Sequence, residues 1–232
     1  MHPIDLTRLL VLGAIWGGSF PFIRVVAPAL GPMATASLRM VIAGVALALY
    51  ARIVRFDVEW RRFWKIYMII GLVNSGLPFV LYSFAALHIP ASYSVQALAA
   101  CLAAAACYAL AVIYIKKQAH LIKPMAVAAG GQLIIGVMML PLLFFAPPPG
   151  PFTSSIALNL LGLALLCSAL AYIIYYRLIM NVGPTQALMV TYLMPAFGML
   201  WGALFLDEAI TGAMIAGCAL IVLGTALVVK RG

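Results

Sequence analysis

An arginine, Arg39, lies about two turns into a long apolar stretch of the sequence. Placing an arginine in the middle of a bilayer costs about 3 kcal/mol on insertion scales. Arg39 could bind an anionic group, such as a substrate carboxylate, through the forked donors of its guanidinium. Alternatively, it is a structural arginine that reaches toward the membrane interface. No Asp or Glu occurs in the neighbouring apolar stretches, which keeps the anion-binding interpretation open.

Aromatic and polar residues inside the apolar stretches are further candidates for binding a small molecule. The aromatic side chains could sandwich an apolar or aromatic substrate or a cation; they are Trp16, Phe20, Tyr82, Tyr108, Tyr172 and Tyr192. The polar side chains that we assign to the same predicted site are Ser19, Asn74, Gln132 and Ser168. Ordinary packing and hydrogen bonds between helices are the alternative roles for both groups.

Two prolines, Pro78 and Pro195, interrupt apolar stretches near these candidates. A proline inside a helix removes one backbone hydrogen bond and can kink the helix. Such kinks are either static or serve as hinges for a change of conformation.

The sequence offers no set of residues for catalysis, nucleotide binding or metal binding. There is no Walker motif, and the four cysteines have no metal-ligand spacing. Intramembrane hydrolases need a nucleophile with a base, paired aspartates or a metal site, and no Lys, Asp or Glu lies well inside an apolar stretch. We therefore predict a protein that is not an enzyme and that carries no cofactor.

The elements that position these residues are predicted to be transmembrane helices. Hydrophobic residues make up 66% of the 232 residues and charged residues only 8%, against about 25% in a soluble domain. Apolar stretches of about 20 residues can cross a bilayer as helices, and we identify eight of them: 7–28, 32–52, 64–88, 91–116, 124–146, 155–178, 185–206 and 210–229. None shows the alternation that a lipid-facing barrel strand needs. The predicted fold class is an all-α membrane protein.

Lysine and arginine positions predict the orientation of these helices. The basic residues at 52–65, at 116–123 and at the C-terminus fall on one side of an eight-helix arrangement, together with Arg8. The opposite side carries the acidic pair Asp207 and Glu208 and almost nothing basic except Arg24. The positive-inside rule then places both termini in the cytoplasm, with the chain in the cell inner membrane. The net charge of +9 has this origin and does not indicate nucleic-acid binding.

The chain resembles itself at an offset of about 92 residues. AIWG at 14–17 aligns with ACYA at 106–109, and PMA at 32–34 aligns with PMA at 124–126. Small gaps then bring IGL at 70–72 onto LGL at 161–163 and LYS at 81–83 near IYY at 174–176. The alignment predicts a first repeat at 1–95 and a second at 96–232.

The two repeats are unequal. The second has five predicted helices, whereas the first has three and the start of a fourth at 91–95. The imbalance predicts that about two helices are missing between Val95 and Gln96, from a ten-helix arrangement of two five-helix units. Either the chain is naturally shortened, or these helices belong to a longer form of the protein. A unit with an odd number of helices, repeated in tandem, is inverted in the membrane, and such repeats place a binding site near the midplane.

In order and content, the motifs of this chain resemble those of the drug/metabolite transporter superfamily, and within it the EamA-type permeases. The motifs are AIWGGSF at 14–20, LRM at 38–40, YSFAALHIPA at 82–91, SALAY at 168–172, GPTQA at 183–187, YLMP at 192–195 and LDE at 206–208. The resemblance covers nearly the whole chain. It implies ten helices and the transport of small metabolites such as amino acids, often outward. It also implies that the missing fourth helix would line the cavity.

We therefore expect an inner-membrane transporter that exports amino acids or related metabolites, with membrane lipid around it. The alternative is a truncated, non-transporting membrane protein or interaction partner of the same family. Small residues at 97–106 and 212–224 would suit close packing, either within the chain or at a homodimer face.

Overall fold

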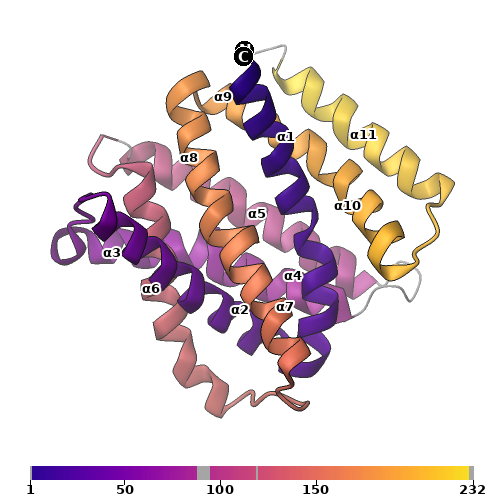
Figure 1. Ribbon diagram of the computed structural model, residues 1–232, viewed down its shortest axis with the longest axis horizontal. Coiled ribbons are helices and arrows are strands. Elements are labelled where there is room, and N and C mark those ends of the chain that lie inside the picture. Colours follow the sequence, from indigo (N-terminus) through magenta and orange to yellow (C-terminus); the bar gives the residue numbers. More distant parts are fainter. Residues whose placement is uncertain (1, 88–94, 119, 230–232) are drawn as a thin grey trace. The chain divides into compact units, whose positions relative to one another are not determined.

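The computed structural model describes residues 2–87, 95–118 and 120–229, and over these residues all regular structure is helical (Figure 1). The α-helices are α1 (Pro3–Gly17), α2 (Ser19–Ile53), α3 (Trp60–Gly71), α4 (Leu77–Leu87), α5 (Val95–Gln118), α6 (Pro124–Met139), α7 (Ser154–Ala164), α8 (Ala171–Val182), α9 (Pro184–Ala187), α10 (Val190–Leu206) and α11 (Gly212–Val229). Two π-helical segments, η1 (Leu72–Gly76) and η3 (Leu165–Leu170), and one 3₁₀ segment, η2 (Leu140–Phe144), continue some of them. The prediction of an all-helical fold is confirmed over the described residues.

Five helical stretches of the described chain are long and apolar enough to cross a membrane, judged by length and composition. They are Pro3–Ile53, Trp60–Leu87, Gln96–Ile115, Pro124–Phe144 and Ser154–Val182, and Val190–Leu206 is a shorter apolar helix. These helices are consistent with a membrane protein. The count of eight crossings stays a prediction, and residues 91–94 of the predicted helix start at 91–95 lie outside the described residues.

Local sequence explains where several helices begin and change. Pro124 occupies the first turn of α6, where its missing N–H would have had no helical partner anyway. The side chain of Thr153 caps α7 by accepting a hydrogen bond from the N–H of Ile156 at 3.3 Å. Pro141 lies in the segment where α6 tightens into the 3₁₀ turn η2, because a proline cannot continue the α-helical bonding pattern.

The long helix α2 contains a break at Gly31, where φ is 74° and ψ is 164°. A residue with a side chain rarely adopts this conformation, so glycine permits the change of direction just before Pro32. The predicted break between the first two membrane stretches falls at this point. The proline-rich segment after η2 packs nearby, because the N–H of Gly150 donates to the carbonyl of Ala29 at 2.8 Å.

Packing divides the chain into two compact units: unit 1 contains Met1–Pro21 and Leu170–Gly232, and unit 2 contains Phe22–Ala169. In unit 1, α1 packs against α8 and α10 (Figure 1). The core there is formed by Leu9, Leu12, Ala171, Leu178, Ala187 and Val190. The repeat boundary between Val95 and Gln96 is a separate matter and stays a prediction.

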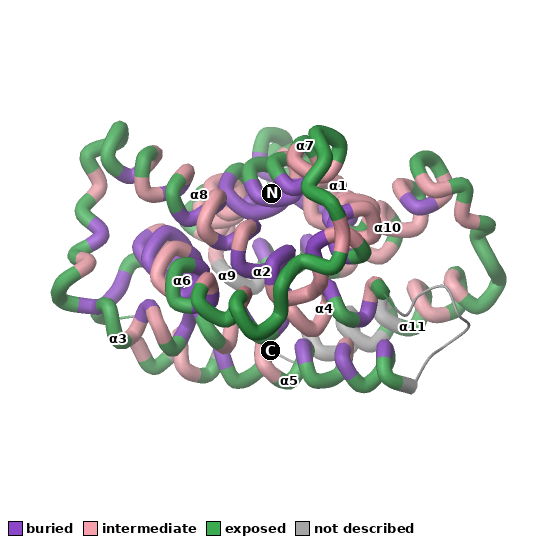
Figure 2. Tube along the Cα trace, turned by 90° about the horizontal axis from the view of Figure 1, so that it is seen from below, coloured by how far each residue is buried: buried purple, intermediate pink, exposed green. Residues whose placement is uncertain are grey.

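In unit 2, α3 packs against α6, and α4 packs against α5. Residues 126–132 of α6 are all buried, whereas much of α5 is exposed (Figure 2). The backbones of α3 and α6 approach closely at Gly71 and Gly131, because a Cβ on Gly71 would overlap the carbonyl group of Gly131. This close approach has the form expected of helices packed within a membrane.

The second half of α2 and α6 meet through two reciprocal contacts in unit 2. A Cβ on Gly44 would lie 2.6 Å from the backbone N of Leu133, and a Cβ on Gly136 would lie 2.8 Å from the backbone N of Val41. Gly136 lies 92 residues after Gly44, and Leu133 lies 92 residues after Val41. If each residue of α2 is replaced by the residue 92 positions later in α6, and the reverse, the contact of Gly44 with Leu133 is converted into the contact of Gly136 with Val41.

Candidate functional site

Arg39 is buried in unit 2, with only 6% of its surface exposed. Its Nε donates a 2.8 Å hydrogen bond to the hydroxyl of Ser168. One terminal nitrogen, Nη2, lies 3.5 Å from the carbonyl oxygen of Cys167. The guanidinium carbon lies 3.9 Å from the centroid of the Phe79 ring. Arg39 and Ser168, both predicted site residues, thus meet inside this unit.

The partners of Arg39 come from segments that depart from regular α-helix. Cys167 and Ser168 belong to the π-helical segment η3, and the Ser168 hydroxyl lies 3.4 Å from the carbonyl oxygen of Leu163, five residues earlier. Phe79 lies in the first turn of α4, directly after the π-helical segment η1. Single π turns in α-helices frequently occur at functional sites. Two such turns therefore provide or adjoin the groups that hold the buried arginine.

These contacts offset part of the cost of burying the charge of Arg39. A desolvated cation over an aromatic ring contributes about 2 kcal/mol, and a hydrogen bond to a charged group contributes about 1.5–3 kcal/mol. The guanidinium plane is also fixed, because its face rests on Phe79 and its Nε edge on Ser168. A fixed guanidinium is suited to bind a planar anion such as a carboxylate.

The predicted aromatic residues Trp16 and Tyr172 meet in unit 1, on α1 and α8. Their ring centroids lie 6.2 Å apart at an angle of 76°. The ring centroids of Tyr175 and Trp16 lie 5.2 Å apart, and the rings of Tyr176 and Tyr172 are stacked with their centroids 5.9 Å apart. Sequence reasoning did not include Tyr175 and Tyr176 among the candidates. The spacing of three residues between Tyr172 and Tyr175 is a signal that could have found one of them, because it places both on one helix face.

The other candidates of unit 1 are less closely associated. Ser19 is buried, and its hydroxyl donates to the backbone carbonyl of Trp16 at 2.6 Å. Phe20 is 44% exposed. Tyr192 is half-buried on α10, and the predicted hinge Pro195 lies inside the same helix.

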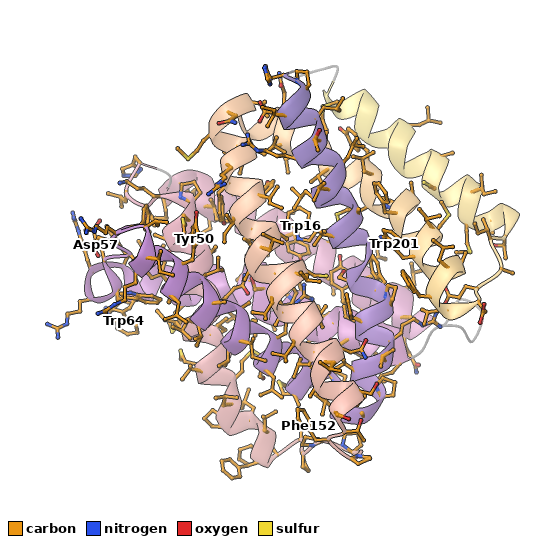
Figure 3. All side chains as sticks on the ribbon, in the orientation of Figure 1. Trp16, Tyr50, Asp57, Trp64, Phe152 and Trp201 are labelled. Carbon is orange, nitrogen blue, oxygen red and sulfur yellow. The ribbon has the colours of Figure 1, made fainter. Side chains whose placement is uncertain are left out.

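A contact that the sequence did not indicate joins α1 and α10 in unit 1. The indole N–H of Trp201 donates to the backbone carbonyl of Ala14 at 2.9 Å. Figure 3 shows Trp201 and Trp16 on these two helices. The contact lies just before α1 ends at Gly17, so it ties the end of this helix to its neighbour.

Within unit 2, Tyr82 of α4 and Tyr108 of α5 approach each other, with ring centroids 6.3 Å apart. Asn74 is half-buried in η1, and the predicted hinge Pro78 is buried at the start of α4. Gln132 is 1% exposed on α6, and neither atom of its amide group has a hydrogen-bond partner among the described residues.

Two ion pairs lie toward helix ends. Asp5 accepts bonds from Arg8 at 2.8 Å and from Asn181 at 2.9 Å, which connects α1 with α8. Arg62 pairs with Glu59 at 3.0 Å near the loop before α3, where Figure 3 shows Asp57 and Trp64. In the part of the chain that the structure describes, no three His, Cys, Asp or Glu residues are grouped so as to hold a metal ion.

The long apolar helices place the chain in the class of multi-pass membrane proteins. The model of the EamA-like transporter family matches residues 6–100 and again residues 95–230, so the chain belongs to this family of the drug/metabolite transporter superfamily. Searches of curated proteins and of solved structures found no match to the chain. The family resemblance seen in the sequence is confirmed, and the family consists of transporters rather than enzymes.

Proposed function

We propose that the protein is a secondary transporter of the inner membrane that exports amino acids or related small metabolites. The observation that carries this proposal is the buried Arg39, held by Ser168 and Phe79 in a chain of the EamA-like transporter family. A buried cation in a membrane protein is expensive, and such residues commonly mark substrate pathways. The residue would bind the carboxylate that all amino acids share.

In this mechanism the guanidinium binds a carboxylate through its two terminal nitrogens while Nε stays on the hydroxyl of Ser168. Such fork-shaped binding adds geometric selection to the charge attraction. The Phe79 ring packs against the guanidinium and holds its plane in position. Tyr82 and Tyr108, which belong to the same unit as Arg39, would contact the apolar part of the substrate.

Alternating access would come from two inverted repeats, residues 1–95 and 96–232. The reciprocal contacts of Gly44 with Leu133 and of Gly136 with Val41 support this proposal. When the two helices are exchanged, each of these two contacts is replaced by the other. Such reciprocity is typical of an interface between two copies related by a two-fold axis. Inverted repeats around such an axis place the site near the midplane and expose it to each side in turn. Pro78 and Pro195 are the proposed hinges, and both termini are proposed to be cytoplasmic.

The energy source proposed is exchange or the substrate gradient itself. The chain has no Walker motif. Its five acidic residues lie at positions 5, 57, 59, 207 and 208, outside the middle of the apolar stretches. A simple proton antiporter would use a carboxylate within the membrane, which favours exchange or facilitated diffusion here.

Flux into proteoliposomes tests the proposal. Vesicles with the purified protein should accumulate labelled amino acids by counterflow, and protein-free vesicles should not. Arg39→Ala should abolish the flux of carboxylates, while the variant still purifies as a folded protein. Unchanged flux in this variant would remove Arg39 from the mechanism.

A second candidate is a shortened, non-transporting protein of the same family, which one set of observations favours. The first family match, residues 6–100, is 41 residues shorter than the second, residues 95–230, and this is about two membrane helices. In the apolar window of Gln96–Ile115, 18% of the residues are buried, whereas 39% to 50% of the residues are buried in the corresponding windows of the other long stretches. Absence of counterflow for every amino acid tested would favour this candidate.

A further inference from the structure

Gln132 has a buried side chain whose hydrogen-bonding capacity is unused within the described part of the chain. It is 1% exposed, and both the amide nitrogen and the amide oxygen lack a partner there. A buried polar group left unsatisfied costs about 1–3 kcal/mol. Such groups are rare in native proteins, and each calls for an explanation. A glutamine in the middle of the apolar helix α6 therefore needs a reason to be there.

The position of Gln132 on α6 is defined by contacts on both sides of it. The preceding residue, Gly131, is in close contact with Gly71 at the end of α3. One turn later, Ile135 lies against Gly76, the last residue of η1: a Cβ on Gly76 would be 3.3 Å from the Ile135 side chain. Gln132 thus lies opposite the π-helical segment Leu72–Gly76. This segment contains the half-buried candidate Asn74.

The face of α6 that carries Gln132 also contacts the residues around Arg39. Ile135 and Met139 pack with Phe79 in one buried cluster, and Phe79 carries the guanidinium of Arg39 on its ring. Gln132 precedes Ile135 by three residues, so the two share a helix face. All of these residues belong to unit 2.

The reciprocal contacts give the separation between the two polar groups along the helices. They show that α2 and α6 run antiparallel, with Val41 opposite Gly136. Along the common axis of the two helices, Arg39 on α2 therefore lies at the same height as residue 138 on α6. Residue 138 is six residues beyond Gln132. At 1.5 Å per residue, Gln132 and Arg39 lie about 9 Å apart along the helix axis, on opposite sides of the crossing.

We propose that Gln132 binds an uncharged polar group on the transported carboxylate, namely a hydroxyl or a carboxamide. The inference rests on the proposed function and adds the class of substrate: amino acids with a neutral polar side chain. A glutamine amide has one acceptor oxygen and two N–H donors, which match a group that both donates and accepts. Two long side chains at levels about 9 Å apart can hold the two ends of one small amino acid. The unsatisfied amide is then a binding group kept at a cost in stability.

Isosteric substrate pairs provide the test. Threonine and valine differ by a hydroxyl in place of a methyl group, and asparagine and leucine have the same branching. Counterflow in proteoliposomes should prefer the polar member of each pair by about tenfold, the size of one good neutral hydrogen bond. Gln132→Leu should bring each ratio close to one. The matched control is Gln96→Leu, the same change at an exposed position of α5, which should keep the wild-type ratios.

Thermal unfolding without substrate gives an independent readout. Gln132→Leu should unfold at the same or a higher temperature than the wild type, because it removes a buried unsatisfied amide. A purely structural glutamine would show a lower unfolding temperature after this change. Threonine should raise the unfolding temperature of the wild type and not that of the variant.

The outcomes separate the two proposals. If none of the four amino acids is transported, the proposed function fails, and this inference fails with it. If all four are transported with equal rates by the wild type, or if the ratios survive in Gln132→Leu, the role of Gln132 is overturned while the transporter assignment stands. If Gln132→Leu does not fold, the wild-type ratios and the ratios of Gln132→Met decide the matter.

Discussion

Arg39 and Ser168 are 129 residues apart in the sequence, and a 2.8 Å hydrogen bond from Nε to the serine hydroxyl joins them inside unit 2. The bond connects α2 to the π-helical segment η3. It holds one edge of the guanidinium, and Phe79 holds one face. The orientation of the charge is therefore set by the protein before any anion arrives, which reduces the entropy lost on binding.

Replacing Ser168 should weaken both the fold and the proposed site. Ser168→Ala removes the acceptor of a charge-assisted hydrogen bond, so we expect a loss of about 2 kcal/mol in the free energy of unfolding. The apparent affinity for carboxylate substrates should fall as well. Unfolding in mixed micelles and counterflow measure the two effects. The control is Ser37→Ala, because buried Ser37 donates to the Met33 carbonyl of its own helix; that change should cost less than about 0.5 kcal/mol. Equal losses in the two variants would contradict the prediction.

Enlarging Gly71 should separate two helices. In Gly71→Ala the new methyl group would overlap the carbonyl group of Gly131, so α3 and α6 must move apart. Overpacking of this kind costs about 1–3 kcal/mol. Gly217→Ala on α11 is the matched change, because no atom of the described residues, apart from the backbone of its own helix turn, lies within 4 Å of a Cβ there. Thermal unfolding in detergent should show a lower midpoint for Gly71→Ala alone, and an unchanged midpoint would argue against the close approach.

Trp201 offers a test of the packing in unit 1. Trp201→Phe removes the N–H that donates to the carbonyl of Ala14. That carbonyl also accepts the N–H of Gly18 at 2.9 Å, so it keeps one partner and the expected loss is only about 1 kcal/mol. Trp64→Phe, at a residue that is 46% exposed, should have less effect on unfolding. A larger loss at Trp64 would contradict the assignment.

Cysteine labelling tests the predicted orientation in the membrane. Asp57 and Phe152 are both exposed and lie in loops that the lysine and arginine distribution places on opposite sides (Figure 3). Asp57→Cys should react with a membrane-impermeant maleimide in inside-out vesicles, and Phe152→Cys should react in intact spheroplasts. The unchanged protein, with its four native cysteines, gives the background. Labelling of both variants from one side would refute the orientation.

Much of the helical layout follows from local sequence. The stretch predicted at 124–146 is found as Pro124–Phe144, and the one predicted at 155–178 as Ser154–Val182. Apolar length and proline punctuation act over a few residues, so a single sequence reveals them. Arg39 and Ser168 could each be selected as polar residues in apolar stretches, for the same reason.

The relations between distant residues could not be read in this way. Nothing in the sequence near Phe79 indicates that it lies beneath Arg39, because that contact depends on how α4 packs beside α2. The π-helical segments Leu72–Gly76 and Leu165–Leu170 could not be predicted either, because they have no composition of their own that separates them from the apolar helices around them. The sequence also could not show that the Gln132 amide lacks a hydrogen-bond partner among the described residues, because this depends on which side chains pack around it.

The π-helical segments have a consequence for how the gene can change. A π turn holds about one residue more than an α turn, while the helices before and after it keep their own faces. Deleting one codon within residues 72–76 would let α3 and α4 join as one continuous α-helix with both faces preserved. Deleting a codon elsewhere in Trp60–Leu87 would rotate every later side chain by about 100°. These two segments are thus places where the helices can lose a residue and keep their packing, at the expense of the polar groups that the extra residue presents.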